Sequence, residues 1–121
     1  MPMARIAYPA RESLEKEAAD ALAGMKPMNV FRMLARADSL APPIFDTATR
    51  LFTRGRTELP ARLRQVAILR VAGAAGFAYL IGHHEPISRR VGLSQPEIEA
   101  SKRGDDSQLG AQERAVARFA A

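Results

Sequence analysis

Residues 59–100, LPARLRQVAILRVAGAAGFAYLIGHHEPISRRVGLSQPEIEA, decide the fold of this chain. Pro60 suits the first turn of a helix, and it leads into a run, residues 66–72, that is apolar on most sides. Small residues at positions 74–76 interrupt the pattern, and a second helical segment follows as far as Gly92. The stretch therefore predicts two consecutive helices. The first should lie at the centre of the protein, because a helix that is apolar all round must be buried.

Helical patterns also precede this stretch. Apolar residues at helical spacing predict helices over residues 12–23 and 28–36, and two prolines at positions 42 and 43 are suited to open another. A turn is expected over residues 54–56, which read Arg-Gly-Arg. In the helix that follows the two prolines, we expect these apolar side chains to point inward: Ile44, Phe45, Leu51 and Phe52.

The C-terminal part of the chain continues in the same way. Ser94 and Glu97 have the spacing of a capping box, which predicts a short helix from that point. A polar loop is expected over residues 102–110, and a helical pattern returns over residues 112–121. Because no capping residue follows this last pattern, we expect either a truncated C-terminus or a helix that is completed by packing on another subunit.

Composition favours a single all-α domain over residues 1–121. Hydrophobic residues make up 47% of the chain and aromatic residues 6%, and alanine is abundant, whereas strands are enriched in β-branched and aromatic residues. The sequence contains no cysteine, which excludes disulfides, thiol catalysis and cysteine zinc sites within this chain and fits a reducing compartment. No apolar stretch approaches the ~20 residues of a membrane span, and the N-terminus lacks a signal-peptide core. We therefore expect a cytoplasmic protein with no membrane association.

The net charge of +5 raises the question of nucleic-acid binding. Arginine outnumbers lysine fifteen to three, but the arginines are scattered along the chain, and aromatic residues are not interleaved with them as a stacking surface requires. We expect a solvated basic surface and no nucleic-acid partner.

His83 and His84 are the two histidines of the chain, and they are the side chains that titrate near neutral pH without perturbation. His84 lies four residues after Leu80 and seven after Phe77, so helical spacing puts these three on one face, whereas His83 shares a face with Tyr79. Consecutive side chains on a helix point about 100° apart, so the pair is poorly suited to share one ion, and no metal site is expected.

Two polar residues interrupt the apolar helix. Gln65 is expected to be a buried or pocket-lining amide, because it lies beside Val66 and Ile68. Arg70 should be largely buried and bonded to a carboxylate or to backbone carbonyls, because an unpaired buried charge costs several kcal/mol. A purely structural interpretation remains open: one histidine bonded across a subunit interface, the other half exposed, and Tyr79 hydrogen-bonded in the core.

The ordered set of motifs in this region resembles the carboxymuconolactone decarboxylase family, which includes the alkylhydroperoxidase D-like proteins. The family-like core covers residues 30–100, and the matching pieces are Leu59, Pro60 and Arg62, the ILRVA stretch, Tyr79, the Gly82-His83-His84 triplet, and Gly92-Leu93-Ser94 with Glu97 and Ile98. The resemblance implies an all-helical bundle around a central helical hairpin, assembled as a homotrimer or homohexamer. Similar members continue beyond the equivalent of Phe119, so the C-terminus looks short.

The resemblance also bears on activity. The peroxidase branch has a glutamate, a Cys-x-x-Cys pair and a histidine, and alignment on His84 puts Gln65, Phe77 and Leu80 at the other three positions. Thiol peroxidase chemistry requires a thiolate, so we expect none from this chain. The decarboxylase branch uses no metal or organic cofactor, but it typically has acidic residues where this chain has Leu80 and Ala78.

Two functions therefore remain in view. The first is a cofactor-free decarboxylase-like enzyme, a lyase acting on a small carboxylated lactone or keto acid. His84 and His83 would be its catalytic residues, and the pocket would be lined by Gln65, Phe77, Leu80, Tyr79 and Arg70. The second is a non-catalytic oligomeric binding or scaffold member of the family, which the replacements at Gln65, Phe77 and Leu80 favour.

Overall fold

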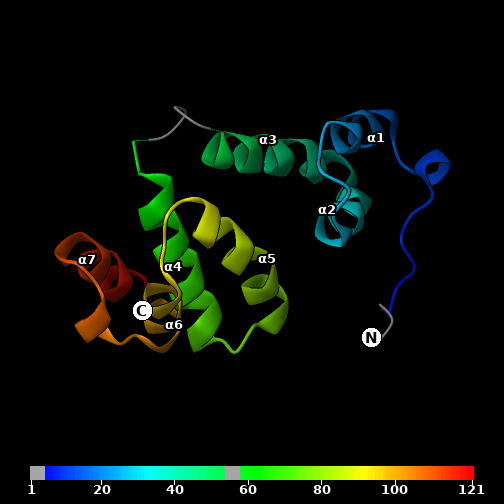
Figure 1. The fold of residues 1–121 in the computed structure, drawn as a ribbon. Helices are drawn as coiled ribbons and strands as arrows, with labels where there is room; N and C mark the ends of the chain where they lie inside the picture. Colours follow the sequence, from blue (N-terminus) through cyan, green and yellow to red (C-terminus); the bar gives the residue numbers. More distant parts are fainter. Residues whose placement is uncertain (1–4, 54–57) are drawn as a thin grey trace. The chain divides into compact units, whose positions relative to one another are not determined.

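The computed structural model describes residues 5–53 and 58–121, and within them all regular structure is helical (Figure 1). The predicted all-α class is confirmed. None of the described helices is long and apolar enough to cross a membrane. The chain divides into two compact units, Met1–Arg56 and Thr57–Ala121. That the whole chain forms one domain stays a prediction, as does the turn over residues 54–56, which lies outside the described residues.

The first unit is built from short helices. A 3-10 turn, η1 (Arg11–Ser13), precedes α1 (Lys16–Ala23), and α2 (Asn29–Leu34) runs through the 3-10 segment η2 (Ala35–Leu40) into α3 (Ala41–Phe52). The helix predicted from residue 12 therefore starts later, at Lys16. A small cluster of buried residues holds the unit together: Ala18, Ala35, Ala41 and Phe45. Phe31 packs edge-on against Phe45, with ring centroids 5.7 Å apart.

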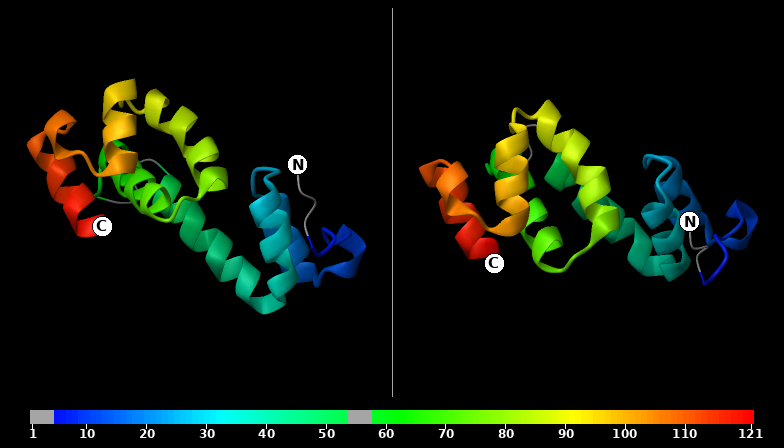
Figure 2. Two further views of the ribbon diagram at one scale, coloured as in Figure 1. Left: turned by 90° about the horizontal axis from the view of Figure 1, so that it is seen from below. Right: turned by 60° about the horizontal axis from the view of Figure 1, so that its bottom comes forward.

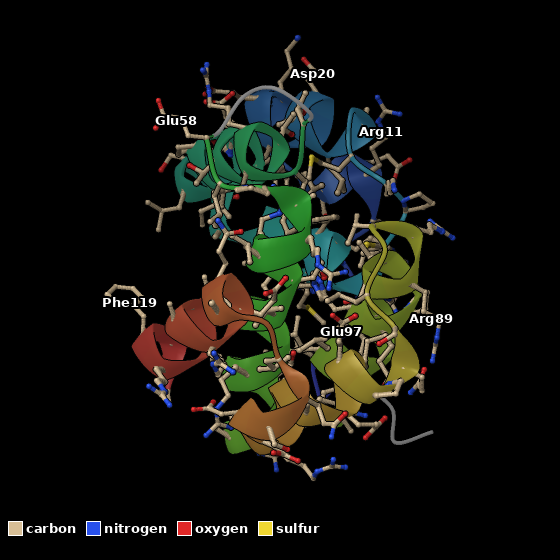
Figure 3. The ribbon with its side chains drawn as sticks, turned by 60° about the vertical axis from the view of Figure 1, so that its left-hand side comes forward. Arg11, Asp20, Glu58, Arg89, Glu97 and Phe119 are labelled. Atoms are coloured by element: carbon tan, nitrogen blue, oxygen red, sulfur yellow. The ribbon has the colours of Figure 1, made fainter. Side chains whose placement is uncertain are left out.

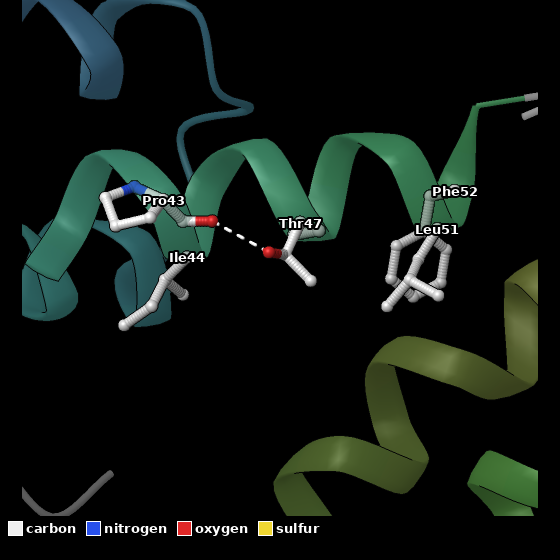
Figure 4. A pocket seen from close by; sticks show the side chains of 6 residues that line it. Pro43, Ile44, Thr47, Leu51 and Phe52 are labelled. Atoms are coloured by element: carbon white, nitrogen blue, oxygen red, sulfur yellow. Dashed lines mark hydrogen bonds between the residues drawn. The ribbon is translucent and has the colours of Figure 1, made fainter.

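The prediction that four apolar residues of α3 point inward is wrong for three of them. Phe45 is 2% exposed, but Ile44, Leu51 and Phe52 are 40%, 45% and 46% exposed. A helix turns by about 100° per residue, so Ile44 and its neighbour Phe45 cannot face the same way. Figure 4 shows Ile44, Leu51 and Phe52 projecting from one side of α3, where they line a shallow apolar groove together with Pro43, Thr47 and Ala48.

The second unit is organised around α4 (Ala61–Ala74), as its apolar pattern predicts. Three helices pack against it: α5 (Ala78–Arg90), α6 (Gln95–Arg103) and α7 (Ala111–Ala120). Figure 2 shows the three gathered around α4 in two further views. The core cluster consists of Val66, Leu69, Leu93, Ile98, Ala100, Leu109 and Ala117. The centre of this unit is therefore larger and more branched than the alanine-rich centre of the first.

Glycines set the ends and the spacing of these helices. Gly76 and Gly92 take left-handed backbone angles, with φ of 62° and 94°, after α4 and α5 respectively. Gly104 has a φ of 73° and ends α6, so the polar loop predicted from residue 102 is wrong at its start, where the helix continues to Arg103. Gly73 has a different role. A Cβ at this position would lie 2.1 Å from the carbonyl oxygen of Lys102, so α4 and α6 cross at backbone contact.

Arg62 ties three segments of the second unit together. Its Nε donates to Oε1 of Glu113 on α7 at 3.0 Å, and its terminal nitrogens donate to the carbonyl of Gly92 and to Oε1 of Glu97 on α6. Glu97 is labelled in Figure 3, among the helices of this unit. Glu97 also closes the predicted capping box: Ser94 N–H donates to its Oε2 at 2.7 Å, and the Ser94 side chain accepts from Glu97 N–H. Burial opposes ionisation of Glu97, but the bonds from Ser94 and Arg62 outweigh it and lower its pKa.

Candidate functional site around His84

The site centres on a hydrogen bond between the two helices of the central hairpin. Nδ1 of His84, on α5, lies 2.9 Å from Oε1 of Gln65, on α4. Gln65 is fully buried, at 0% exposure, while His84 is half-buried. An amide oxygen can only accept a hydrogen bond, so with this orientation Nδ1 carries the proton. The basic nitrogen of the neutral ring is then Nε2.

Ser88 completes this polar group. It lies one turn after His84 on α5 and is fully buried. Its hydroxyl donates to the His84 carbonyl at 2.7 Å, and its Oγ lies 3.4 Å from Oε1 of Gln65. Sequence reasoning missed Ser88. The signal that could have found it is its spacing: a serine four residues after a functional histidine lies on the same helical face.

The buried amide of Gln65 is only half satisfied. Its Nε2 is buried and has no hydrogen-bond partner among the described residues. A buried unpaired donor costs about 1–3 kcal/mol, and such groups are rare in folded proteins. In the structure the amide oxygen of Gln65 faces His84, and the amide nitrogen is the unsatisfied end.

The surroundings of His84 favour its neutral form. Burial lowers the pKa of His84 from its ordinary value of 6.5, and electrostatic repulsion from His83 and Arg64 lowers it further. Arg64 is half-buried and directly precedes Gln65 on α4. The sequence analysis did not single out Arg64, because arginines are spread over the whole chain and no spacing distinguishes this one.

Arg70, the arginine that the sequence analysis proposed for this pocket, has a different environment. Its Nη1 donates to the carbonyl of Lys102 at 3.3 Å, and its guanidinium packs over Gly104, where a Cβ would lie 2.9 Å from Cζ. The predicted bond to a backbone carbonyl is confirmed. Arg70 is partly buried, which is consistent with the prediction that its guanidinium is not open to solvent. It bonds the end of α6, whereas Arg64 is the arginine whose charge acts on His84.

Three of the remaining predicted site residues, Phe77, Tyr79 and His83, form a row of rings at the start of α5. The rings of His83 and Tyr79 meet edge to face with centroids 4.6 Å apart, as their helical spacing predicts. Phe77 and Tyr79 follow at 6.2 Å. Phe77 and Tyr79 are 51% and 41% exposed, and Leu80 is half-buried. That these residues line a pocket with His84 stays a prediction.

The described residues contain no group of three or more histidine, aspartate or glutamate side chains placed to hold a metal ion. Glu85, which follows the two histidines, has its carboxylate held by Lys102 at 2.6 Å and by Arg89 at 3.3 Å. From its own side chains the site can offer proton transfer at His84 and attraction of an anion by the positive charge of Arg64.

Comparison with known proteins identifies the family. The model of the carboxymuconolactone decarboxylase family matches residues 42–121, and the chain belongs to this family. The match begins later than the core expected from the motifs, at α3, and continues through α7. Neither the curated proteins nor the solved structures gave a significant match.

The residues that carried the resemblance now divide into two groups. Arg62, Gly92, Ser94 and Glu97 belong to the bonded set that joins α4, α6 and α7, so their role is structural. His84 belongs to the polar group between α4 and α5. The motifs therefore identify the scaffold more than the chemistry.

Proposed function

We propose that this protein is a carboxymuconolactone decarboxylase-like lyase. It would act without a cofactor on a small carboxylated lactone or keto-acid-type substrate, with His84 transferring the proton. The observation that carries the proposal is the 2.9 Å contact between Gln65 Oε1 and His84 Nδ1, which leaves Nε2 as the basic nitrogen of a half-buried ring.

The chemistry needs one proton transfer. When the bond between the carboxylate and the adjacent carbon breaks, carbon dioxide leaves and the electron pair stays on that carbon, which must then be protonated. A histidine with a lowered pKa is a stronger acid once it is protonated, and its neutral form takes up a proton again for the next turnover. Burial and the neighbouring charges give His84 this property.

The site also offers a positive charge for the substrate. Arg64 is half-buried, and its charge reaches His84. A guanidinium in a partly desolvated setting is suited to bind a carboxylate through two parallel hydrogen bonds. This supports a carboxylate as the ligand and assigns to Arg64 the part that the sequence analysis gave to Arg70.

A substrate panel tests the proposal. The full chain is incubated with small lactone carboxylates and β-keto acids, and carbon dioxide release is followed for the wild type, His84→Ala and His83→Ala. We expect turnover of at least one compound, loss of turnover in His84→Ala, and a smaller effect in His83→Ala. Equal turnover in wild type and His84→Ala would overturn the assignment.

The second candidate, a non-catalytic binding or scaffold member of the family, is favoured by the residues that replace acidic and thiol groups: Gln65, Phe77 and Leu80. In that case the same panel yields no carbon dioxide, and calorimetry detects small carboxylates binding to the wild type but only weakly to His84→Ala.

We propose that the protein assembles with itself, as a homotrimer or homohexamer. Large apolar side chains exposed on the second unit support this: Val71 is 50% exposed, Phe77 51% and Phe119 93%. Exposed apolar surface of this kind is typical of interaction sites. Light scattering at micromolar concentration tests it, and a mass close to the 13.2 kDa of one chain would contradict it.

A further inference from the structure

We propose that Gln65 is a positioning residue that fixes His84 as the tautomer protonated at Nδ1. Ser88 assists by bonding to the backbone carbonyl of His84 and lying close to the Gln65 amide oxygen. The inference deepens the proposed function by naming which ring nitrogen faces the chemistry. Only the role of the tautomer in catalysis rests on the proposed function, since the tautomer itself can be observed without any substrate.

The geometry of the bond carries the inference. Oε1 of Gln65 and Nδ1 of His84 lie 2.9 Å apart, a normal hydrogen-bond distance, and the amide is fully buried. Water cannot easily replace the fully buried amide, although the His84 ring is only half-buried. The orientation of the amide decides whether the ring nitrogen opposite must donate or accept.

The unpaired nitrogen of Gln65 is the second observation. Nε2 is buried and without a partner among the described residues, although a turned amide would present this nitrogen to His84 instead. One end of the enclosed amide is unpaired in either orientation, because a turned amide would put Oε1 in the place of Nε2. The structure presents the oxygen to His84 and leaves the N–H unsatisfied.

Ser88 restrains the histidine from its own helix. Its hydroxyl proton goes to the His84 carbonyl at 2.7 Å, which is the shorter of its two contacts. The weaker contact to Gln65 Oε1, at 3.4 Å, leaves that oxygen available to the ring. Ser88 therefore contributes to the position of both partners without competing for the bond between them.

Among the described residues, the partner of His84 Nδ1 is the amide of Gln65 and not a carboxylate. Arg64 on α4 and His83 on α5 contribute positive charge at His84. Glu85, the next residue on α5, is engaged by Lys102 of α6 and by Arg89. A neutral amide thus sets the tautomer here without the rise in pKa that a carboxylate partner would bring.

The tautomer can be read directly. The full chain is labelled with ¹⁵N, and long-range proton–nitrogen correlation spectra of the imidazoles are recorded at pH 8, with His83→Gln assigning the two rings. A solvated histidine favours the form protonated at Nε2, so a signal for the Nδ1–H form at His84 is the expected result. The Nε2–H form at His84 would overturn the proposal.

Three variants separate positioning from simple packing. In Gln65→Met, which keeps the volume but removes the acceptor, His84 should revert to the Nε2–H form. In Gln65→Glu, it should keep the Nδ1–H form, and its pKa should rise by about one unit or more, a tenfold gain in proton affinity. Ser88→Ala should keep the Nδ1–H form with broadened ring signals.

The outcome is independent of activity. If Gln65→Met does not fold, the wild-type spectrum and Gln65→Glu still decide the question. If the wild type shows the Nδ1–H form but no substrate is turned over, the tautomer assignment stands and the proposed function fails. Retention of the Nδ1–H form in folded Gln65→Met would show that Gln65 is not what sets it.

Discussion

The two compact units differ in how their helices are joined. In the first unit, the ion pairs among the described residues, Lys16–Asp20 and Arg50–Asp46, each lie within one helix and are largely exposed. In the second unit, Arg62 and Lys102 bond residues on other helices and are 32% and 18% exposed. Exposed pairs within a helix contribute little to stability. Ion pairs therefore help to specify the packing of the second unit but not that of the first, where the long-range polar contacts include the bonds from Arg36 to the carbonyl of Ala7.

The cores of the two units also differ, whereas most of their helix starts do not. Among the described α-helices, α6 has a complete capping box, while α1 to α3 and α4, α5 and α7 begin without a side-chain cap bond. The core of the first unit is three alanines and Phe45, while the second buries Val66, Leu69 and Ile98. The family match covers the whole second unit but only α3 and a few flanking residues of the first. The part that the family shares is thus the part with the more specific contacts.

The largest effect is expected from Gly73→Ala. The new methyl group would lie 2.1 Å from the Lys102 carbonyl oxygen, and neither backbone can move without separating α4 from α6. We expect a loss of roughly 3 kcal/mol or more in the free energy of unfolding. Urea denaturation at fixed protein concentration measures it. A stability equal to that of the wild type would show that the two helices do not cross this closely.

Arg62→Met should have the next largest effect. It leaves Glu97 and Glu113, which are 21% and 14% exposed, without their shared cation. We expect a loss of about 2 kcal/mol, less than for a fully buried pair because the group is partly solvated. Asp46→Asn on α3 is the matched control and should leave the unfolding midpoint unchanged. Equal effects of the two variants would remove the contrast between the units.

Gly82→Ala should stabilise the protein. Gly82 lies inside α5, and a Cβ there would meet no atom within 4 Å. Alanine in a helix interior is favoured over glycine by about 0.5–1 kcal/mol, so the melting temperature should rise. The variant is the counterpart of Gly73→Ala, since the same substitution is expected to act with opposite sign. A fall in melting temperature would indicate that a partner covers this face of α5.

The smallest effect concerns pH. Because the pKa of His84 is lowered in the folded protein, the unfolded chain binds a proton at higher pH than the folded one. Stability should therefore fall as the pH decreases below about 6.5 and passes through the folded pKa. His84→Gln should flatten this dependence between pH 7.5 and 5, whereas His83→Gln should retain most of it, because burial is the largest cause of the lowered pKa of His84. NMR titration of His84 with a midpoint at or above 6.5 would contradict the reasoning.

Much of the fold could be predicted from local pattern. The proline before α4, the apolar run within it and the capping box at Ser94 each depend on residues close together in the sequence. The same reasoning failed at α3, where Ile44, Leu51 and Phe52 are exposed, because spacing identifies an apolar face without saying how much of it a neighbour covers.

Local spacing also predicted part of the candidate site. Helical spacing separates His84 from His83 and puts His83 beside Tyr79, and both are properties of one helix. It could not choose Arg64 over Arg70, because that choice depends on how α4 is rotated against α5 and α6.

The sequence by itself determined the helical class, the central position of α4 and the family, because these follow from periodicity, composition and an ordered set of motifs. Only the tertiary structure decided which polar groups meet. Gln65 and His84 are nineteen residues apart and Arg62 and Glu113 fifty-one. A hydrogen bond needs its two atoms within about 3 Å in a defined direction, and only the packed helices bring such distant residues together.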